Sequence, residues 1–149
     1  MKTIKKLSTI TVVAMLGFGV SSCLNTDDNN NFSVDGYLNG TEINVNNDSI
    51  NPVGQVTNVH ITYKTTNSCQ EFIAFRLLNN TNDTIHTIGV YGRQTNMNGA
   101  CLDEVKTFTK TYKFTPKKAG KNKIRVLAGI DPTDNTKNIY IEKTLDIKN

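Results

Sequence analysis

The chain has 149 residues, of which 37% are hydrophobic and 20% are charged, and its formal net charge is +4. Three of the 17 Lys and Arg residues lie in the first 22 positions, which leaves 14 basic against 13 acidic side chains in the remainder. This near balance carries no signature of nucleic-acid binding, so we expect no nucleic-acid partner. The remaining length suits one ordinary domain with its own core.

Residues 1–22 have the layout of a secretory signal peptide. Lys2, Lys5 and Lys6 precede a short apolar run, ITVVAMLGFGV, which is followed by two small serines. A helix over this run of about 11 residues is too short to cross a hydrocarbon core of about 30 Å. We therefore predict a signal-peptide helix that is removed, rather than a permanent membrane span.

The four residues that end at Cys23, VSSC, resemble the lipobox of bacterial lipoproteins. In that family the cysteine is lipidated and becomes the mature N-terminus, so the resemblance implies a lipid anchor on Cys23. Asp27 and Asp28 follow in an Asn-rich polar stretch and resemble the surface-export signal of Bacteroidota lipoproteins. The resemblance implies an outer-membrane lipoprotein that is surface-exposed or, alternatively, faces the periplasm, with residues 23–33 as a flexible tether.

Residues 34–149 are predicted to form one all-β domain, because no window in them has the period of a helix. One or two short strands are expected within 32–45, where Asp35-Gly36 and Asn39-Gly40 are dipeptides typical of turns. Further strands are expected over 56–64, 70–78, 84–91, 102–115, 123–129 and 138–147. Six or seven strands separated by Gly, Pro, Asn and Asp favour an antiparallel sandwich.

The patterns of individual strands predict which residues are buried. In 56–64 the apolar residues alternate with polar ones, so one face is expected to carry Val59, Ile61 and Tyr63. The segment 70–78 is apolar on both faces, which is typical of a central strand. The polar segment 92–101 is predicted to be a long loop.

Residues 112–149 contain five consecutive features that form a recognisable order. They are an aromatic strand, a Pro-x-x-x-Gly turn, a Val- and Ile-containing strand, a polar hairpin and a Thr-Leu-x-Ile closing strand. This order resembles the last three strands of immunoglobulin-like and fibronectin-III-like domains of bacterial surface proteins. The matching residues are Phe114, Pro116, Gly120, Ile124, Val126, Thr144, Leu145 and Ile147. The resemblance implies an antiparallel immunoglobulin-like β-sandwich of about seven strands, although the chain lacks the tryptophan of antibody domains; a small open barrel is the alternative.

Cys69 and Cys101 are the two cysteines that remain once Cys23 carries a lipid. Outside the cytoplasm such a pair is a disulfide candidate, and both residues lie in polar segments at the edges of predicted strands. Two free thiols or half of a metal site are the alternatives, but His60 and His86 lack the spacing of metal ligands. We therefore predict a Cys69–Cys101 disulfide and no metal.

Two polar regions are candidate binding surfaces. The first is the predicted loop 92–101 and the residue before it, where side chains could stack on a glycan or form hydrogen bonds with it. The candidate residues are Tyr91, Arg93, Asn96 and Asn98. Residues 106–125 hold eight positive charges and no negative ones, namely Lys106, Lys110, Lys113, Lys117, Lys118, Lys121, Lys123 and Arg125. This basic patch either faces water, where lysine limits aggregation, or contacts anionic headgroups or glycans.

We find no arrangement of residues typical of a catalytic or cofactor site. His60 lies on the polar face of its predicted strand, His86 is expected to be half-buried, and both are interpreted as structural. The chain has no Gly-x-Ser-x-Gly elbow and no phosphate-binding loop, so we expect neither enzyme activity nor a cofactor. The sequence predicts a membrane-anchored, non-catalytic binding, adhesion or accessory module with a protein or glycan partner. The alternatives are a structural envelope protein that contacts anionic lipid or glycan through its basic strands and, more remotely, a small hydrolase.

Overall fold

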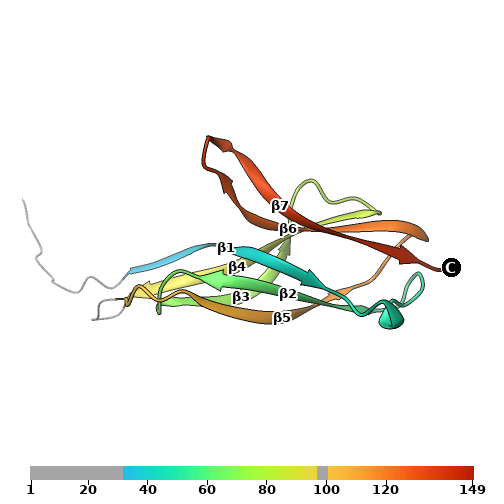
Figure 1. The fold of residues 1–149 in the computed structure, drawn as a ribbon, viewed down its shortest axis with the longest axis horizontal. Coiled ribbons are helices and arrows are strands. Elements are labelled where there is room, and N and C mark those ends of the chain that lie inside the picture. The colour runs from blue at the N-terminus through green and yellow to red at the C-terminus, as the bar shows by residue number, and fades with distance from the viewer. Residues whose placement is uncertain (1–31, 97–100) are drawn as a thin grey trace, which may run out of the picture.

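The computed structural model describes residues 32–96 and 101–149, and over these residues the chain is all-β (Figure 1). Its strands are β1 (Phe32–Asn44), β2 (Thr57–Thr65), β3 (Gln70–Leu77), β4 (Ile85–Asn96), β5 (Lys106–Phe114), β6 (Gly120–Asp131) and β7 (Asp134–Ile147). A single turn of 3-10 helix, η1 (Asn47–Ser49), follows β1. The prediction of about seven strands and no long helix is confirmed for the described residues. The predicted signal peptide and Cys23 lie outside them.

The strands form one mixed sheet in the order β5-β2-β1-β4-β6-β7, and β3 pairs with β4 beside this path. The pairs are antiparallel except for β4 and β6, which run parallel where residues 85–88 meet residues 123–126. The expectation of a wholly antiparallel arrangement is therefore wrong. Alternation along a strand assigns side chains to faces, but it does not encode the direction of the neighbouring strand, so it could not reveal this pair.

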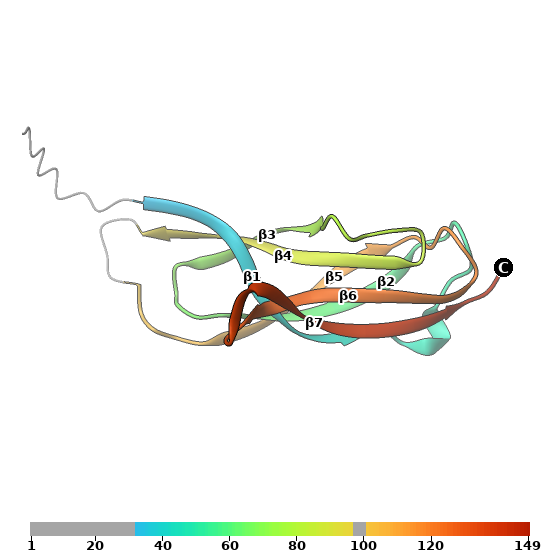
Figure 2. The same cartoon turned by 90° about the horizontal axis from the view of Figure 1, so that it is seen from above.

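The long strand β1 passes from one part of the sheet to the other. Its course between the two parts is visible in Figure 2. Its residues 32–38 pair with β4 and its residues 39–44 pair with β2, and the register shifts between Gly40 and Glu42. The turns expected at Asp35-Gly36 and Asn39-Gly40 are therefore absent. Gly40 instead allows β1 to approach β6 closely, because a Cβ atom there would collide with the side chain of Val126 on β6.

The two parts of the sheet share one hydrophobic core. Val59, Ile61 and Tyr63 of β2 are buried on one face, as predicted. They belong to the same cluster as buried residues from the far end of the strand order, which include Ile88, Val90, Ile124, Val126, Leu145 and Ile147. Residues from both ends of the strand order can share one core only if the sheet folds over on itself, and both views show this arrangement (Figures 1 and 2).

Strand β3 lies at an edge, because among the described strands it pairs only with β4. The prediction of a central strand over 70–78 is therefore wrong. Phe72 and Phe75 pack against the core, whereas Ile73 and Leu77 are 40% and 56% exposed. An apolar run signals burial on average, but it does not determine how many strands pair with the segment.

His86 on β4 is expected to make the stability of the fold depend on pH. It is 7% exposed and its ring lies edge-on to Phe114, with 4.7 Å between the ring centroids. Burial, and then the nearby positive charge of Lys117, lowers the pKa of His86 below its usual value of 6.5. In the unfolded chain the imidazole gains a proton near its usual pKa, whereas in the folded chain it does so only at lower pH. The free energy of unfolding should therefore fall as the pH drops below about 6.5.

Urea unfolding between pH 8 and pH 5 measures this effect. The wild-type chain should lose stability across the lower half of that range, whereas His86→Leu should show a flatter profile there, because leucine fills the site without titrating. Equal slopes in the two proteins would show that His86 is not the responsible group.

Candidate functional site

An open groove lies where β1, β6 and β7 meet the connection between β3 and β4, and its volume is about 920 Å³. Its polar lining consists of two tyrosines and four asparagines, Tyr37, Asn39, Asn79, Asn80, Asn138 and Tyr140. Its apolar lining includes Leu77, Leu78, Leu127 and Ile139. Pockets that bind small molecules span about 300–1,000 Å³, so this groove is large enough for a ligand of several rings. We take it as the candidate functional site.

Tyr37 on β1 lies flat against the neighbouring strand β4. Gly89 of β4 makes this possible, because a Cβ atom there would collide with the Tyr37 ring and would lie 3.3 Å from Leu78. Tyr91, two residues further along β4, meets Tyr37 edge-on, with 5.7 Å between the ring centroids. Tyr37 remains 45% exposed. The ring is therefore held in place while one surface stays available for contact.

Charged side chains on β1, β3 and β4 help to orient Tyr91. The Tyr91 hydroxyl donates a hydrogen bond of 3.0 Å to Asp35, and Arg93 donates two more to the same carboxylate, at 2.7 and 3.3 Å. The guanidinium of Arg76 on β3 stacks on the Tyr91 ring, 3.3 Å from its centroid. The hydrogen bonds from Arg93, and then from Tyr91, hold the pKa of Asp35 below its usual value, while the bond to Asp35 raises the pKa of Tyr91. Three strands thus cooperate to orient the aromatic pair.

Tyr140 on β7 is supported in a similar way. The guanidinium of Arg125 on β6 lies over its ring, 4.4 Å from the centroid. Glu142 holds that arginine and the neighbouring Lys123 through contacts of 2.8 Å each, and Lys123 is the main cause of a lowered Glu142 pKa. The Asn138 amide donates a hydrogen bond of 3.4 Å to the Tyr140 hydroxyl. The second tyrosine of the groove is therefore also fixed before any ligand arrives.

Part of the predicted ligand-binding loop is a strand. Tyr91, Arg93 and Asn96 lie on β4, which continues to residue 96 because it pairs there with β1 and, through residue 94, with β3. The loop prediction is therefore wrong over 92–96, since the polar sequence does not reveal those partners. Tyr91 and Arg93 belong to the network that supports Tyr37, whereas Asn96 pairs with Phe32 at the end of the strand. Asn98 lies outside the described residues.

The two tyrosines that line the groove were not predicted from the sequence as binding residues. One local signal was present, because Tyr37 and Asn39, like Asn138 and Tyr140, are two residues apart and so share a strand face. Nothing in the sequence brings the two pairs together, since about one hundred residues separate them. The groove arises only when β1 and β7 meet across β6.

The eight basic residues of the predicted patch do not gather on one face. On β5, Lys110 lies opposite the buried Ile61 and places its ammonium 5.8 Å from the Phe72 ring centroid, whereas Lys113 lies on the other face, opposite Asn58. Lys117 and Lys121 are exposed. Three carboxylates form ion pairs with the other four: Glu104 with Lys106, Asp83 with Lys118, and Glu142 with both Lys123 and Arg125. This dispersion weakens the idea of a single anionic-surface contact.

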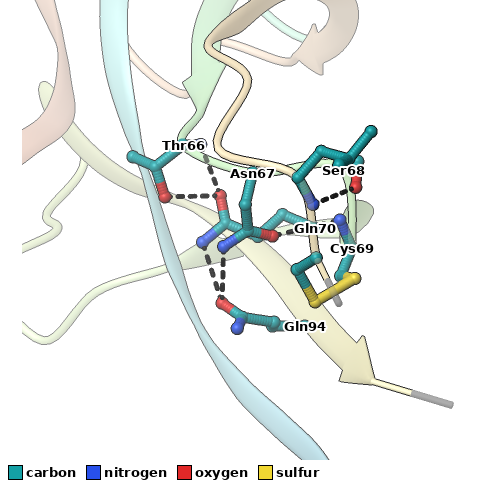
Figure 3. Close-up of a disulfide and its surroundings, with 8 residues drawn as sticks. Thr66, Asn67, Ser68, Cys69, Gln70 and Gln94 are labelled. Carbon is teal, nitrogen blue, oxygen red and sulfur yellow. Dashed lines mark hydrogen bonds between the residues drawn. A yellow bond between two sulfur atoms is a disulfide. The ribbon is translucent and has the colours of Figure 1, made fainter. Parts of the chain in front are cut away.

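The predicted disulfide is present and joins Cys69 to Cys101, with 5.4 Å between their Cα atoms (Figure 3). Amide side chains surround it, and Asn67 and Gln70 both donate hydrogen bonds to the Gln94 carbonyl oxygen, at 3.1 and 3.3 Å. This cluster joins the turn before β3 to the end of β4.

His60, by contrast, lies on the exposed face of β2, where its Nδ1 atom is 3.2 Å from the Thr111 hydroxyl. Within residues 32–96 and 101–149, no three His, Cys, Asp or Glu side chains gather as a metal site. The same residues include no helix long and apolar enough to span a membrane.

Comparison with known proteins yields no relative. No family model, no curated protein and no solved structure matches this chain.

Replacing Gly89 with alanine should displace Tyr37. The added methyl group would overlap the ring, and the exposed tyrosine can swing outward, so we expect a modest loss of about 1 kcal/mol in the free energy of unfolding. The change should appear in the NMR shifts of the Tyr37 ring protons. Gly36→Ala is the matched control, because a Cβ atom on Gly36 meets nothing within 4 Å. Unchanged Tyr37 shifts in Gly89→Ala would contradict the close packing of this ring on β4.

Proposed function

We propose that this protein is a lipid-anchored, non-catalytic binding module at the surface of a bacterial outer membrane, and that its groove receives the ligand. The signal-like residues 1–22 and the VSSC sequence ending at Cys23 support the anchor. The proposal includes an immunoglobulin-like β-sandwich. The folded-over sheet with one shared core supports that fold.

The observation that carries the binding role is the fixed position of the two groove tyrosines. Tyr37 is held by Gly89 and Tyr91, and Tyr140 is held by Arg125 and Asn138. Side chains that are ordered before binding lose less conformational entropy when a ligand arrives, so a supported aromatic pair favours affinity. The surrounding salt bridges are exposed and add little to stability. A role in orienting these rings accounts for them better than a role in holding the fold together.

Ligand capture by whole cells tests the proposal. Cells that produce the wild-type chain, Cys23→Ser or the Tyr37→Ala/Tyr140→Ala double variant are incubated with fluorescent pools of oligosaccharides and of peptides. Wild-type cells should retain label from at least one pool. Cys23→Ser cells should lose it because the protein lacks the lipid that holds it at the cell surface, and the double variant should lose it while remaining on the cell. Equal labelling of all three strains would refute the proposed function.

A further inference from the structure

The lining of the groove is uncharged. Among the described residues that line it there is no Asp, Glu, Lys, Arg or His, although one-fifth of the whole chain is charged. Charged groups that support the two tyrosines already have partners, since Asp35 is paired with Arg93 and Glu142 with Lys123 and Arg125. The Arg76 guanidinium lies over the Tyr91 ring and does not line the groove. A charged ligand would lose part of its hydration in this groove and would meet no opposite charge on the residues that line it, which is unfavourable. The geometry therefore points to a neutral ligand.

The polar groups of the groove suit hydroxyl groups. Asn39, Asn79, Asn80 and Asn138 come from β1, the β3–β4 connection and β7, and all four are exposed. Each carboxamide both donates and accepts hydrogen bonds, and a hydroxyl group does the same. A ligand that carries many hydroxyl groups can therefore satisfy all four carboxamides, whichever way each of them is turned.

The aromatic rings suit the apolar faces of sugar rings. Tyr37 and Tyr140 line the groove together with Leu78 and Ile139, so flat apolar surface lies beside the carboxamides. A pyranose has the same combination, because its C–H groups form an apolar face and its hydroxyl groups project from the rim. Specific sites typically combine such apolar surface with a few well-placed polar groups.

We propose that the groove binds a neutral oligosaccharide of several hexose units. This inference rests on the proposed function, because it assigns the ligand class of the same groove. The volume of about 920 Å³ lies near the upper end of the range of about 300–1,000 Å³ for ligand sites, which fits several linked rings better than one. A neutral peptide segment is the competing occupant. It can also form hydrogen bonds with the carboxamides, but it lacks the repeated flat faces that two tyrosines would contact.

Isothermal titration of the lipidated full chain in a non-glycosidic detergent tests the ligand class. The probes are neutral hexose oligosaccharides of about four to six units, uronic-acid oligosaccharides of the same length, and neutral polar peptides. The neutral oligosaccharides should bind saturably and more tightly than the other two classes. Tyr140→Ala should weaken that binding at least about tenfold, because it removes one stacking surface. Tyr140→Phe, which keeps the ring, should stay within about threefold of wild type.

Phe108→Ala is the matched control, since Phe108 is an aromatic residue with 41% exposure that does not line the groove. It should leave the affinity unchanged. If a peptide or an acidic oligosaccharide binds in a Tyr140-dependent way and no neutral oligosaccharide binds, the ligand class is wrong and the proposed binding function stands. If Tyr140→Ala changes the binding of none of the three classes, both the ligand class and the role of the groove are overturned.

Discussion

Replacing Phe114 with alanine is expected to lower the free energy of unfolding by about 3–5 kcal/mol, which is the usual cost of deleting a buried phenylalanine side chain. Phe114 is the last residue of β5 and is 0% exposed. Its ring contacts His86 of β4, so it links two strands that are not neighbours in the sheet. Alanine would leave a cavity between the two parts of the folded sheet, and the paired backbone around it could close that cavity only in part.

Phe108→Ala gives the matched comparison on the same strand and the same face. Phe108 is 41% exposed and stacks on Tyr63 at a centroid distance of 5.8 Å, so its replacement should cost only about 1 kcal/mol. Urea unfolding followed by circular dichroism measures both values. Equal losses for the two variants would contradict the placement of the core between β4 and β5.

Removing the Cys69–Cys101 disulfide is expected to lower the free energy of unfolding by about 3–4 kcal/mol, because the bridge closes a loop of about 33 residues in the unfolded chain. The bridge also holds native contacts at one end of the domain. The Ser68 amide donates to the Leu102 carbonyl at 3.0 Å, and the Leu102 amide donates to the Ser68 hydroxyl at the same distance. These hydrogen bonds join the segment before β5 to the turn before β3, beside the disulfide (Figure 3).

The double variant Cys69→Ser/Cys101→Ser measures this contribution without leaving a free thiol. Its urea midpoint should fall below that of the oxidised wild type, and the reduced wild type should behave like the variant. Gln94→Ala is the control, because it removes the acceptor of Asn67 and Gln70 while the disulfide stays intact. It should cost about 1 kcal/mol. A reduced chain as stable as the oxidised one would show that the native contacts alone hold this end together.

The candidate site was predictable only in fragments. Tyr91 and Arg93 were singled out from the sequence, but as loop residues that meet a ligand, whereas the structure shows them supporting Tyr37 from β4. Their partner Asp35 was expected to form a turn and instead pairs with Arg93 across the sheet. Because the groove depends on contacts between β1, β6 and β7, no local sequence pattern could have predicted it.

The sequence by itself determined the strand content, the buried face of β2 and the disulfide partners. The alternation of apolar and polar residues has a period of two, so it predicts that Val59, Ile61 and Tyr63 share one buried face whichever strands lie beside β2. Two cysteines remain outside the predicted anchor, so only one disulfide pairing is possible between them. Only the tertiary structure decided that β1 crosses the sheet, that β6 runs parallel to β4 and that β3 lies at an edge. These features depend on which distant strands pack together, and Gly40 and Gly89 acquire their roles from that packing, because each makes room for a side chain far away in the sequence.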